Sequence, residues 1–566
     1  MKPMNPQNPF TFAALALLGL LPHIHAQTAP TEPLSMINSA QVGGKAPASE
    51  FPELPPIAEG PFEPSDDSFR KNYRYPDWFR DAKFGIWAHW GPQSVPGVNG
   101  WYARKMYGHD GVKFETGKPT GQSFVNKYHL EHYGHPSKFG YKDIIPLWKA
   151  EKFDPDALMA LFKKTGAKYF VSMGVHHDNF FLWNSKFHRW NAANMGPKKD
   201  IVGLWQQAAK KQGLRFGVSE HLAASFNWFQ TAHGADTTGP MAGVPYDGND
   251  PQYQDLYHTK ASDDHDPKGV YTNIRNPAWK RHWFDAIKEV LDQYQPDFLY
   301  SDSGLPFGGV GQTLLAHFYN QNMANNGGTI QAVYASKRVS EGRWVRTVER
   351  GRIEEISADP WQSDTTFNPD WFYQSRDAWL AQNKVDKDYL SAQQVVLMLI
   401  DIVSKNGNLL LNVTQTPDGE VVPEILPALE QIGSWLAING EGIYATRPFK
   451  VFGEGPSSSN EEKGHFGGVK DWPAKGYSEK DIRFTQSKDG KSLYAFVMAE
   501  PTGEIRIESL GSGAGHLERP ISTISLLGSD AKLDWRQEPG ALLIQPPAKW
   551  PSQHAVAFKI TMGDKL

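Results

Sequence analysis

Residues 276–302 of this 566-residue chain, NPAWKRHWFDAIKEVLDQYQPDFLYSD, contain the clearest helix and strand signals in the sequence. Asn276 followed by Pro277 is typical of a helix start, because Asn caps backbone N–H groups and Pro fits the first helical position. Pro296 ends the helix, and the apolar run at 298–302 predicts a buried strand. Between Pro277 and Pro296, apolar side chains recur at helical spacing: Trp279, Trp283, Ile287, Leu291 and Tyr294.

The same order of helix and strand occurs twice earlier in the chain. One unit begins at Asp154-Pro155 and ends in a strand at 169–173, and the other begins at Asp200 and ends in a strand at 215–219. Further strand candidates are 83–90, 330–335, 345–349 and 409–413. Such alternation predicts a mainly parallel sheet, and this number of strands favours a TIM-like (β/α) barrel. The alternative, an open doubly wound sheet, would carry an early Gly-rich phosphate turn, and the sequence has none.

The two ends of the chain differ from this middle part. After Arg447, short alternating runs separated by turn residues predict an antiparallel β-sandwich over 451–566, which leaves 66–450 for the barrel. Residues 27–65 are rich in Pro, Ala, Ser and Glu and predict a linker or extended arm. Residues 1–26 have the pattern of a signal peptide, which predicts export to the periplasm or the medium, with a retained membrane anchor as the alternative.

The composition limits the classes of partner. A formal net charge of -4 gives no basic field, so nucleic acid is not expected. The chain has no cysteine, which excludes disulfides and thiolate chemistry. Apart from the leader, no segment is long and apolar enough to span a membrane, so the mature chain is expected to have no span. The oligomeric state stays open.

Reactive side chains follow several predicted strands, where a barrel builds its active site. They are His89, the run His176-His177-Asp178, Asp302 and Glu349. A metal site is one explanation for the histidines. It is disfavoured because neighbouring side chains of a strand point to opposite faces, so we expect no metal and no cofactor. Two carboxylates on separate strands suit glycoside hydrolysis, although the spacing of Asp302 and Glu349 does not itself bring them together.

Several motifs in fixed order resemble glycoside hydrolase family 29, the α-L-fucosidases. They are KFGIWAHWG at 83–91, SVP at 94–96, HHDNFFLWNS at 176–185, GPKKD at 196–200, YSDS at 300–303, GNLLLNV at 407–413 and PDG at 417–419. The resemblance runs from about residue 76 to 450. It implies a barrel with a C-terminal β-sandwich, no metal, and double displacement on a fucosylated oligosaccharide or polysaccharide.

The resemblance also implies roles for single residues. Asp302 matches the family's nucleophile, and the sugar-binding histidines resemble His89, His176 and His177. Trp101 and Tyr300 occupy positions similar to aromatic sugar contacts. The alternative for both aromatic residues is core packing.

The chain departs from the family pattern at three places. Where many members carry a Trp-Glu pair, this sequence has Trp361-Gln362, so Glu349 is the expected acid/base, with Glu354 and Glu355 as rivals. Gly100 stands where many members have Glu. Ser219-Glu-His-Leu222 replaces a Tyr-rich strand end, so Glu220 or His221 is expected to contact substrate.

These departures leave two alternatives open. The first keeps the fold but changes the substrate to a sulfated fucan or an α-L-galactoside; a sulfated substrate would need a basic pocket, for which Lys337, Arg338, Arg343 and Arg346 are the candidates. The second is a catalytically silent fucose-binding protein. The long segments 106–148 and 229–272 are expected to wall the site and set specificity beyond the fucose.

Overall fold

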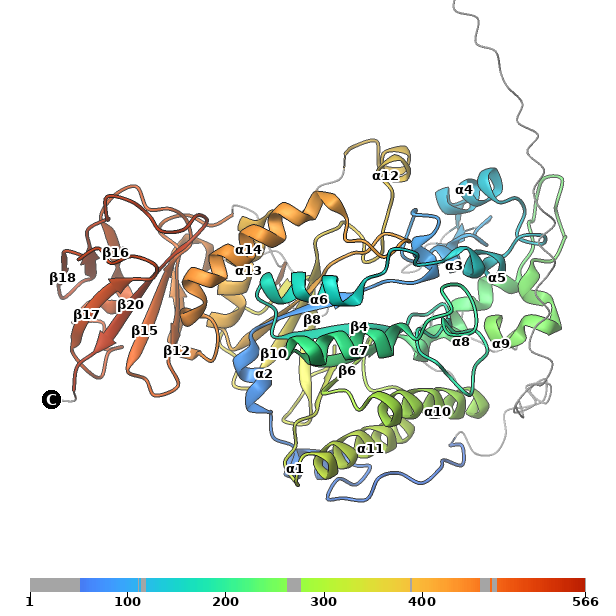
Figure 1. The fold of residues 1–566 in the computed structure, drawn as a ribbon, viewed down its shortest axis with the longest axis horizontal. Coiled ribbons are helices and arrows are strands. Elements are labelled where there is room, and N and C mark those ends of the chain that lie inside the picture. Colours follow the sequence, from blue (N-terminus) through green and yellow to red (C-terminus); the bar gives the residue numbers. More distant parts are fainter. Residues whose placement is uncertain are drawn as a thin grey trace, which may run out of the picture. The chain divides into compact units, whose positions relative to one another are not determined.

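The computed structural model describes residues 51–109, 111–112, 119–261, 276–386, 389–458, 469–470 and 476–564 (Figure 1). The expected signal peptide at 1–26 and the first part of the arm, 27–50, lie outside these residues. So do residues 110 and 113–118 of the first long segment and 262–272 of the second. Within the described residues, no helix is long and apolar enough to cross a membrane.

Eight parallel strands close into a barrel, in the order β1-β11-β10-β8-β7-β6-β5-β4. Their bounds are β1 Phe84–Ala88, β4 Tyr169–Val175, β5 Arg215–Glu220, β6 Phe298–Ser301, β7 Val333–Ser336, β8 Val345–Glu349, β10 Trp361–Thr366 and β11 Gly407–Asn412. Closure confirms the predicted barrel and excludes the open sheet. Seven of these strands coincide with predicted ones; β10 was missed.

The capping signals of the sequence operate as expected. The Asn276 side chain accepts a hydrogen bond from Trp279 N at the start of α10, Pro277–Tyr294. Asp154 and Asp200 cap α6 and α7 in the same way, and Gly213 ends α7 in the left-handed conformation. The described helices are α1 Asp66–Asn72, α2 Asp77–Ala82, α3 Tyr102–Lys105, α4 Phe124–His132, α5 Tyr141–Ile144, α6 Pro155–Lys164, α7 Ile201–Gln212, α8 Ser225–Trp228, α9 Gln254–Tyr257, α10, α11 Gly309–Asn325, α12 Arg376–Asn383, α13 Ala392–Ser404 and α14 Leu426–Asn439.

Strand β10 escaped prediction because its sequence, WQSDTT, shows neither an apolar run nor alternation. All six of its side chains are buried all the same. It pairs with β8 on one side and β11 on the other. The closed barrel therefore buries polar side chains on this strand, and each of them needs a hydrogen-bond partner.

The C-terminal part consists of two antiparallel sheets with a core of their own between them. The five-stranded sheet has the order β12-β14-β15-β20-β17 and the three-stranded sheet β16-β19-β18. The bounds are β12 Arg447–Glu454, β14 Ile482–Gln486, β15 Ser492–Val497, β16 Ile505–Ile507, β17 Ile521–Leu526, β18 Trp535–Gln537, β19 Leu542–Ile544 and β20 Val556–Met562. These two sheets agree with the predicted β-sandwich. In the structure, its first strand, β12, begins at Arg447.

Buried contacts join the two parts. Tyr494 and Phe496 of β15 belong to the same apolar core as the barrel helices. Trp435 Nε1 on α14 donates to the carbonyl of Ala555, at 2.9 Å. A short strand β9, Gly351–Arg352, pairs with β13, Val469–Lys470.

Candidate active site

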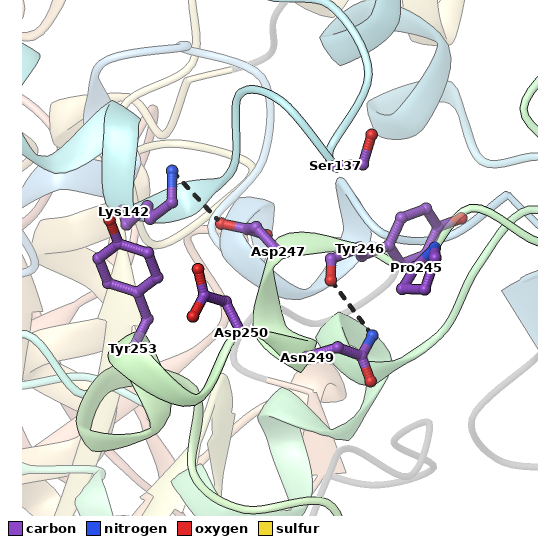
Figure 2. A pocket seen from close by; sticks show the side chains of 8 residues that line it. All are labelled: Ser137, Lys142, Pro245, Tyr246, Asp247, Asn249, Asp250 and Tyr253. Carbon is purple, nitrogen blue, oxygen red and sulfur yellow. Dashed lines mark hydrogen bonds and ion pairs between the residues drawn. The ribbon is translucent and has the colours of Figure 1, made fainter.

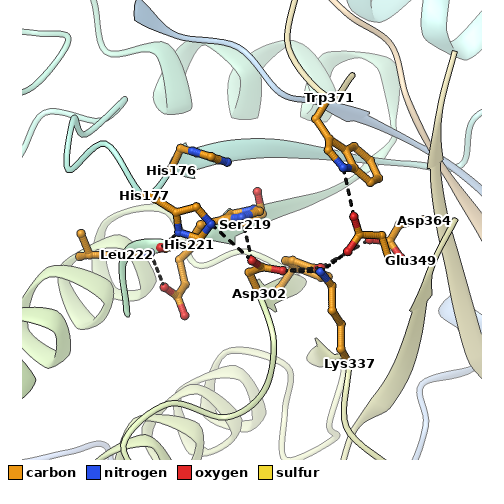
Figure 3. Close-up of polar contacts among 12 residues, drawn as sticks. His176, His177, Ser219, His221, Leu222, Asp302, Lys337, Glu349, Asp364 and Trp371 are labelled. Carbon is orange, nitrogen blue, oxygen red and sulfur yellow. Dashed lines mark hydrogen bonds and ion pairs between the residues drawn. The ribbon is translucent and has the colours of Figure 1, made fainter. Parts of the chain in front are cut away.

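Asp302 lies directly after β6, buried among cationic and aromatic side chains (Figure 3). Its Oδ1 lies 2.6 Å from Lys337 Nζ, and its Oδ2 lies 3.5 Å from His177 Nε2 and 3.6 Å from His221 Nδ1. Burial alone would raise the pKa of Asp302, but the Lys337 ammonium, with help from His221, holds it well below its ordinary value. The carboxylate is therefore ionised and confined, as a nucleophile requires.

Lys337 joins two carboxylates. Its Nζ contacts Asp302 and also Glu349 Oε2, and Figure 3 shows the ammonium between them. The other Glu349 oxygen accepts from Trp371 Nε1, at 3.1 Å. Burial disfavours the charged lysine, yet the two carboxylates raise the pKa of Lys337 above its ordinary value. Lys337 comes directly after β7, so the barrel rule for strand ends could have indicated it.

Three histidine rings around the site have one nitrogen fixed by the scaffold. Nδ1 of His89 meets Asn412 Oδ1 at 3.2 Å, and Nδ1 of His177 meets the His221 carbonyl at 2.7 Å, so both nitrogens carry the proton. Gln93 Nε2 donates to Nδ1 of His176, at 3.0 Å, which makes that nitrogen an acceptor. Burial lowers the pKa of all three rings, that of His177 to about 3. Neutral rings then present Nε2 of His89 and His177 as acceptors and Nε2–H of His176 as a donor.

The structure separates the two residues expected from the strand end of β5. His221 faces Asp302, and its Nε2 is buried without a hydrogen-bond partner among the described residues. Glu220 points the other way, because side chains alternate along a strand. Its Oε2 accepts from Leu222 N and from Trp283 Nε1 on α10. Glu220 therefore lies outside the group around Asp302.

The two expected aromatic contacts also differ. The Trp101 ring is partly exposed, with its centroid 5.8 Å from that of His177. Tyr300 is buried beneath the site, with its ring 4.8 Å from Trp87. Its hydroxyl donates toward Asp302 Oδ1 and toward Asp364 Oδ2, both at 3.4 Å. Tyr300 is thus placed to act through its hydroxyl on the nucleophile rather than as an open stacking surface.

The rivals for the acid/base are far less well placed than Glu349. Glu354 and Glu355 are exposed, in a bend beyond β9. Asp364, which the sequence did not indicate, lies fully buried on β10. Burial, opposed by Lys337, raises its pKa to about 7. Sequence reasoning missed Asp364 because it missed the strand, and it overlooked Trp371 in the following loop.

Three of the four basic residues considered for a sulfated substrate, Lys337, Arg338 and Arg343, have different surroundings. Lys337 is held by Asp302 and Glu349, whereas Arg343 forms an ion pair with Asp66 on α1. Arg338 is exposed. Gly100 sits against Asp370, whose Oδ2 accepts from the Gly100 N–H at 2.9 Å, and a Cβ at Gly100 would come within 2.8 Å of that carboxylate.

Among the described residues, one group has the donor set for a metal ion: His176, His177 and His221, whose ligand atoms lie within 4.8 Å of one another. Three imidazoles suit Zn²⁺ or Cu²⁺. However, Nδ1 of His176 already accepts from Gln93, so Nε2 of that ring carries the proton and is not available as a metal ligand in this arrangement. His177 and His221 also face the Asp302 carboxylate, where the hydroxyl groups of a sugar would need them.

A separate hollow of about 500 Å³ lies between the two long segments, lined by Lys142 and Tyr253 among others (Figure 2). Asp247 in its wall accepts hydrogen bonds from Tyr107 and Tyr257, at 2.8 and 2.6 Å. Burial raises the pKa of Asp247 to about 6. The described parts of both segments are therefore tied together. Their expected role in specificity stays a prediction.

Comparison with known proteins agrees with this geometry. Residues 53–441 match the alpha-L-fucosidase family and residues 475–561 the alpha-L-fucosidase C-terminal domain. The tissue alpha-L-fucosidase of Rattus norvegicus is 25% identical over 543 residues, covering 93% of this chain and 96% of the relative. That of Homo sapiens is 26% identical over 528 residues, covering 90% and 92%.

Solved structures give the same result. The Thermotoga maritima alpha-fucosidase in complex with a mechanism-based inhibitor superposes with a TM-score of 0.63 at 25% identity, covering 88% of this chain and 100% of that one. The same enzyme in complex with fucose gives a TM-score of 0.62. The chain therefore belongs to the α-L-fucosidase family of glycoside hydrolases, and its activity is the hydrolysis of α-L-fucosides.

Proposed function

We propose that the chain is a retaining, exo-acting α-L-fucosidase with Asp302 as nucleophile and Glu349 as acid/base. The observation that carries this proposal is the single ammonium of Lys337 in contact with both carboxylates. Two oxygens that share one nitrogen lie within about 5 Å of each other, close to the ~5–5.5 Å separation of retaining glycosidases. An inverting enzyme would need a wider gap, to admit a water molecule.

In the first step, Asp302 attacks the anomeric carbon of the fucoside. Glu349 gives its proton to the glycosidic oxygen, the bond to the leaving group breaks, and a fucosyl ester of Asp302 forms. Asp302 loses its negative charge in this step while Glu349 gains one. Because Lys337 contacts both groups, its ammonium always has one anionic partner.

In the second step, Glu349 takes a proton from a water molecule that attacks the same carbon. The ester bond to Asp302 breaks, and fucose leaves with the configuration it had in the substrate. Trp371 Nε1 fixes one oxygen of Glu349 throughout. The other oxygen is then the one that exchanges the proton.

The histidine rings support recognition of a terminal sugar. Nε2 of His177 and Oδ2 of Asp302 are both acceptors 3.5 Å apart, so a hydroxyl that donates between them would relieve their repulsion. Nε2 of His89 can accept from a second hydroxyl, and Nε2–H of His176 can donate to one. Such fixed partners hold the ring relative to the nucleophile. The substrate is accordingly a fucosylated oligosaccharide or polysaccharide, cleaved at its terminal fucose.

The place of action proposed is the periplasm or the medium. Lys2 and the apolar run of residues 10–21 support export by a signal peptide removed after Ala26. N-terminal sequencing of the protein recovered from the periplasm or medium of an expressing bacterium would give Gln27 as the first residue. An intact Met1 on the exported protein would contradict cleavage.

The test of mechanism is the anomer of the first product. NMR during hydrolysis of an aryl α-L-fucoside should show α-L-fucose before mutarotation, whereas β-L-fucose as first product would exclude retention. With Asp302→Ala and added azide, the small anion can take the place of the carboxylate, and β-L-fucosyl azide should accumulate. Glu349→Ala with azide provides the matched variant: azide that attacks the intact ester of Asp302 gives the α-azide instead.

A further inference from the structure

A chain of hydrogen-bonding side chains continues beneath the nucleophile, inside the barrel. Thr347 Oγ1 donates to Asp364 Oδ1 at 3.0 Å, and the Tyr300 hydroxyl reaches Asp364 Oδ2 at 3.4 Å. The same hydroxyl lies 3.4 Å from Asp302 Oδ1. All of these groups are buried. Tyr300 thus stands between two carboxyl groups, one of which performs the chemistry.

A phenol has one proton, so Tyr300 can donate to only one of these carboxyl groups at a time. If Asp364 is ionised, both carboxylates compete for that proton. If Asp364 is protonated, its O–H can donate to the Tyr300 oxygen, which leaves the Tyr300 proton for Asp302. The protonation of Asp364 therefore decides whether the nucleophile has this hydrogen bond.

We propose that Asp364 is a positioning residue for the hydrolysis, which in its protonated form directs the Tyr300 hydroxyl onto the nucleophile Asp302. This rests on the proposed role of Asp302. Asp364 does not touch substrate in this arrangement; it acts through Tyr300 on one oxygen of Asp302. A donor on that oxygen confines the carboxylate and steers its second oxygen toward the anomeric carbon.

The surroundings of Asp364 fit a carboxyl group that holds a proton. Its charged and titratable neighbours are Lys337 after β7, Glu349 on β8, Tyr300 and Asp302 on or after β6, and Tyr169 on β4. Burial, the largest cause, outweighs the attraction of Lys337 and the hydrogen bond from Thr347, so the pKa of Asp364 is raised to about 7. The switch would therefore operate near neutral pH.

Asp364→Asn is the informative variant. The amide oxygen can accept from Thr347 while the amide N–H donates to Tyr300, so Asn imitates the protonated acid at every pH. The substrate should be an aryl α-L-fucoside with a very good leaving group, because its cleavage hardly depends on the acid Glu349. On this substrate, wild-type kcat/KM should fall about tenfold or more above pH 7, as a hydrogen bond to a charged group is lost. Asp364→Asn should keep the low-pH rate without that fall.

Two further variants make the result decisive. Tyr300→Phe should have a low kcat/KM already at acidic pH and show no further fall near pH 7. Adding Asp364→Asn to Tyr300→Phe should change kcat/KM no further. Asp247→Asn removes a buried carboxyl in the hollow of Figure 2 and should leave the profile unchanged. Thermal midpoints establish that each variant is folded, and if Asp364→Asn does not fold, the Tyr300→Phe profile decides.

If the fall of kcat/KM near pH 7 persists in Asp364→Asn, the proposal is overturned. Additive effects of Asp364→Asn and Tyr300→Phe on kcat/KM would overturn it too. These outcomes differ from a failure of the nucleophile assignment, which Asp302→Asn tests by itself. If Asp364 positions the Tyr300 hydroxyl, Asp364→Ala should also have a lower kcat/KM than Asp364→Asn at pH 5. Equal rates there would contradict it.

Discussion

Among the described residues, Asp302 and Asp401 are carboxylates whose side chains are buried next to cations; Asp302 follows β6, and Asp401 lies on α13. Asp302 meets Lys337 and two histidines, and Asp401 on α13 meets Lys405, Arg352 and Arg483 at 2.8, 3.2 and 2.6 Å. In both cases burial would raise the pKa of the carboxyl, and the cations instead lower it below its ordinary value. The two sites therefore share the same electrostatic arrangement.

The two sites differ in whether the partners of the carboxylate are permanently charged. Around Asp302 the partners are not permanently charged or exclusive: Lys337 has a second carboxylate, and the buried ring of His177 is neutral, because burial lowers its pKa to about 3. Around Asp401 two partners are guanidinium groups, which stay charged at every relevant pH. Arg483 comes from β14, so that cluster joins the sandwich to the barrel. A buried anion with exchangeable partners suits chemistry, and one with permanent partners suits structure.

The largest effect is expected from Asp302→Asn. Losing the nucleophile should lower kcat by roughly 10⁴-fold or more, as when other covalent catalysts are removed. The melting temperature should fall as well, because the depressed pKa of Asp302 means that Lys337 and His221 stabilise its charged form in the folded state. The fall should be smaller than for Asp401→Asn, since Lys337 keeps Glu349 as a partner. Turnover of an aryl fucoside and a melting curve check both. Near-normal turnover by Asp302→Asn would mean that Asp302, like Asp401, has no catalytic role.

Next comes Glu349→Ala, which should lower kcat/KM by about 10²–10⁴-fold on fucosides with poor leaving groups. Activated aryl fucosides should suffer much less, because they need little protonation. Rates along a series of leaving groups of rising pKa measure the difference. The same loss across the series would assign the acid to another residue.

Asp401→Asn should act on stability instead. Removing one member of a buried ion cluster leaves its partners uncompensated and costs about 3–5 kcal/mol. Urea unfolding would measure the loss, and the kcat of the folded fraction should stay that of the wild type. A fall in kcat with unchanged stability would mean that the two clusters are not specialised as described.

The smallest effect concerns Asp178, a buried carboxyl that forms no ion pair with any described residue. It accepts from the Tyr141 hydroxyl at 2.5 Å, and burial raises its pKa to about 7. The unfolded chain releases this proton near pH 4, so the folded state binds more protons between pH 4 and 7. Asp178 therefore makes stability fall as pH rises through that window, by up to about 1.4 kcal/mol per pH unit. The free energy of unfolding of wild type and of Asp178→Asn should be measured at pH 5 and pH 7. It should change less with pH in Asp178→Asn than in wild type, and an equal change would contradict the assignment.

Much of the barrel could be predicted, because seven of its strands are apolar and several helices begin with clear caps. Strand β10 could not, since its polar residues are buried by closure of the barrel, which no local pattern records. The same strand carries Asp364, so the missed strand concealed a site residue. His89, His177 and Asp302 were indicated by their place after strands. The direction of Glu220 depended on which face of β5 turns inward, and only the closed barrel fixes that.

The closure of the barrel has a consequence in time. The N–H of His89, directly after β1, donates to the side chain of Asn412, the last residue of β11, across 323 positions of sequence. At about 5–20 residues per second, a ribosome needs roughly 15–65 s to make that intervening stretch. Throughout this interval one edge of β1, with Phe84, Ile86 and Trp87, has no partner strand. The nascent chain therefore passes through a long period with an open apolar edge, and the yield of native protein depends on what covers that edge until β11 arrives.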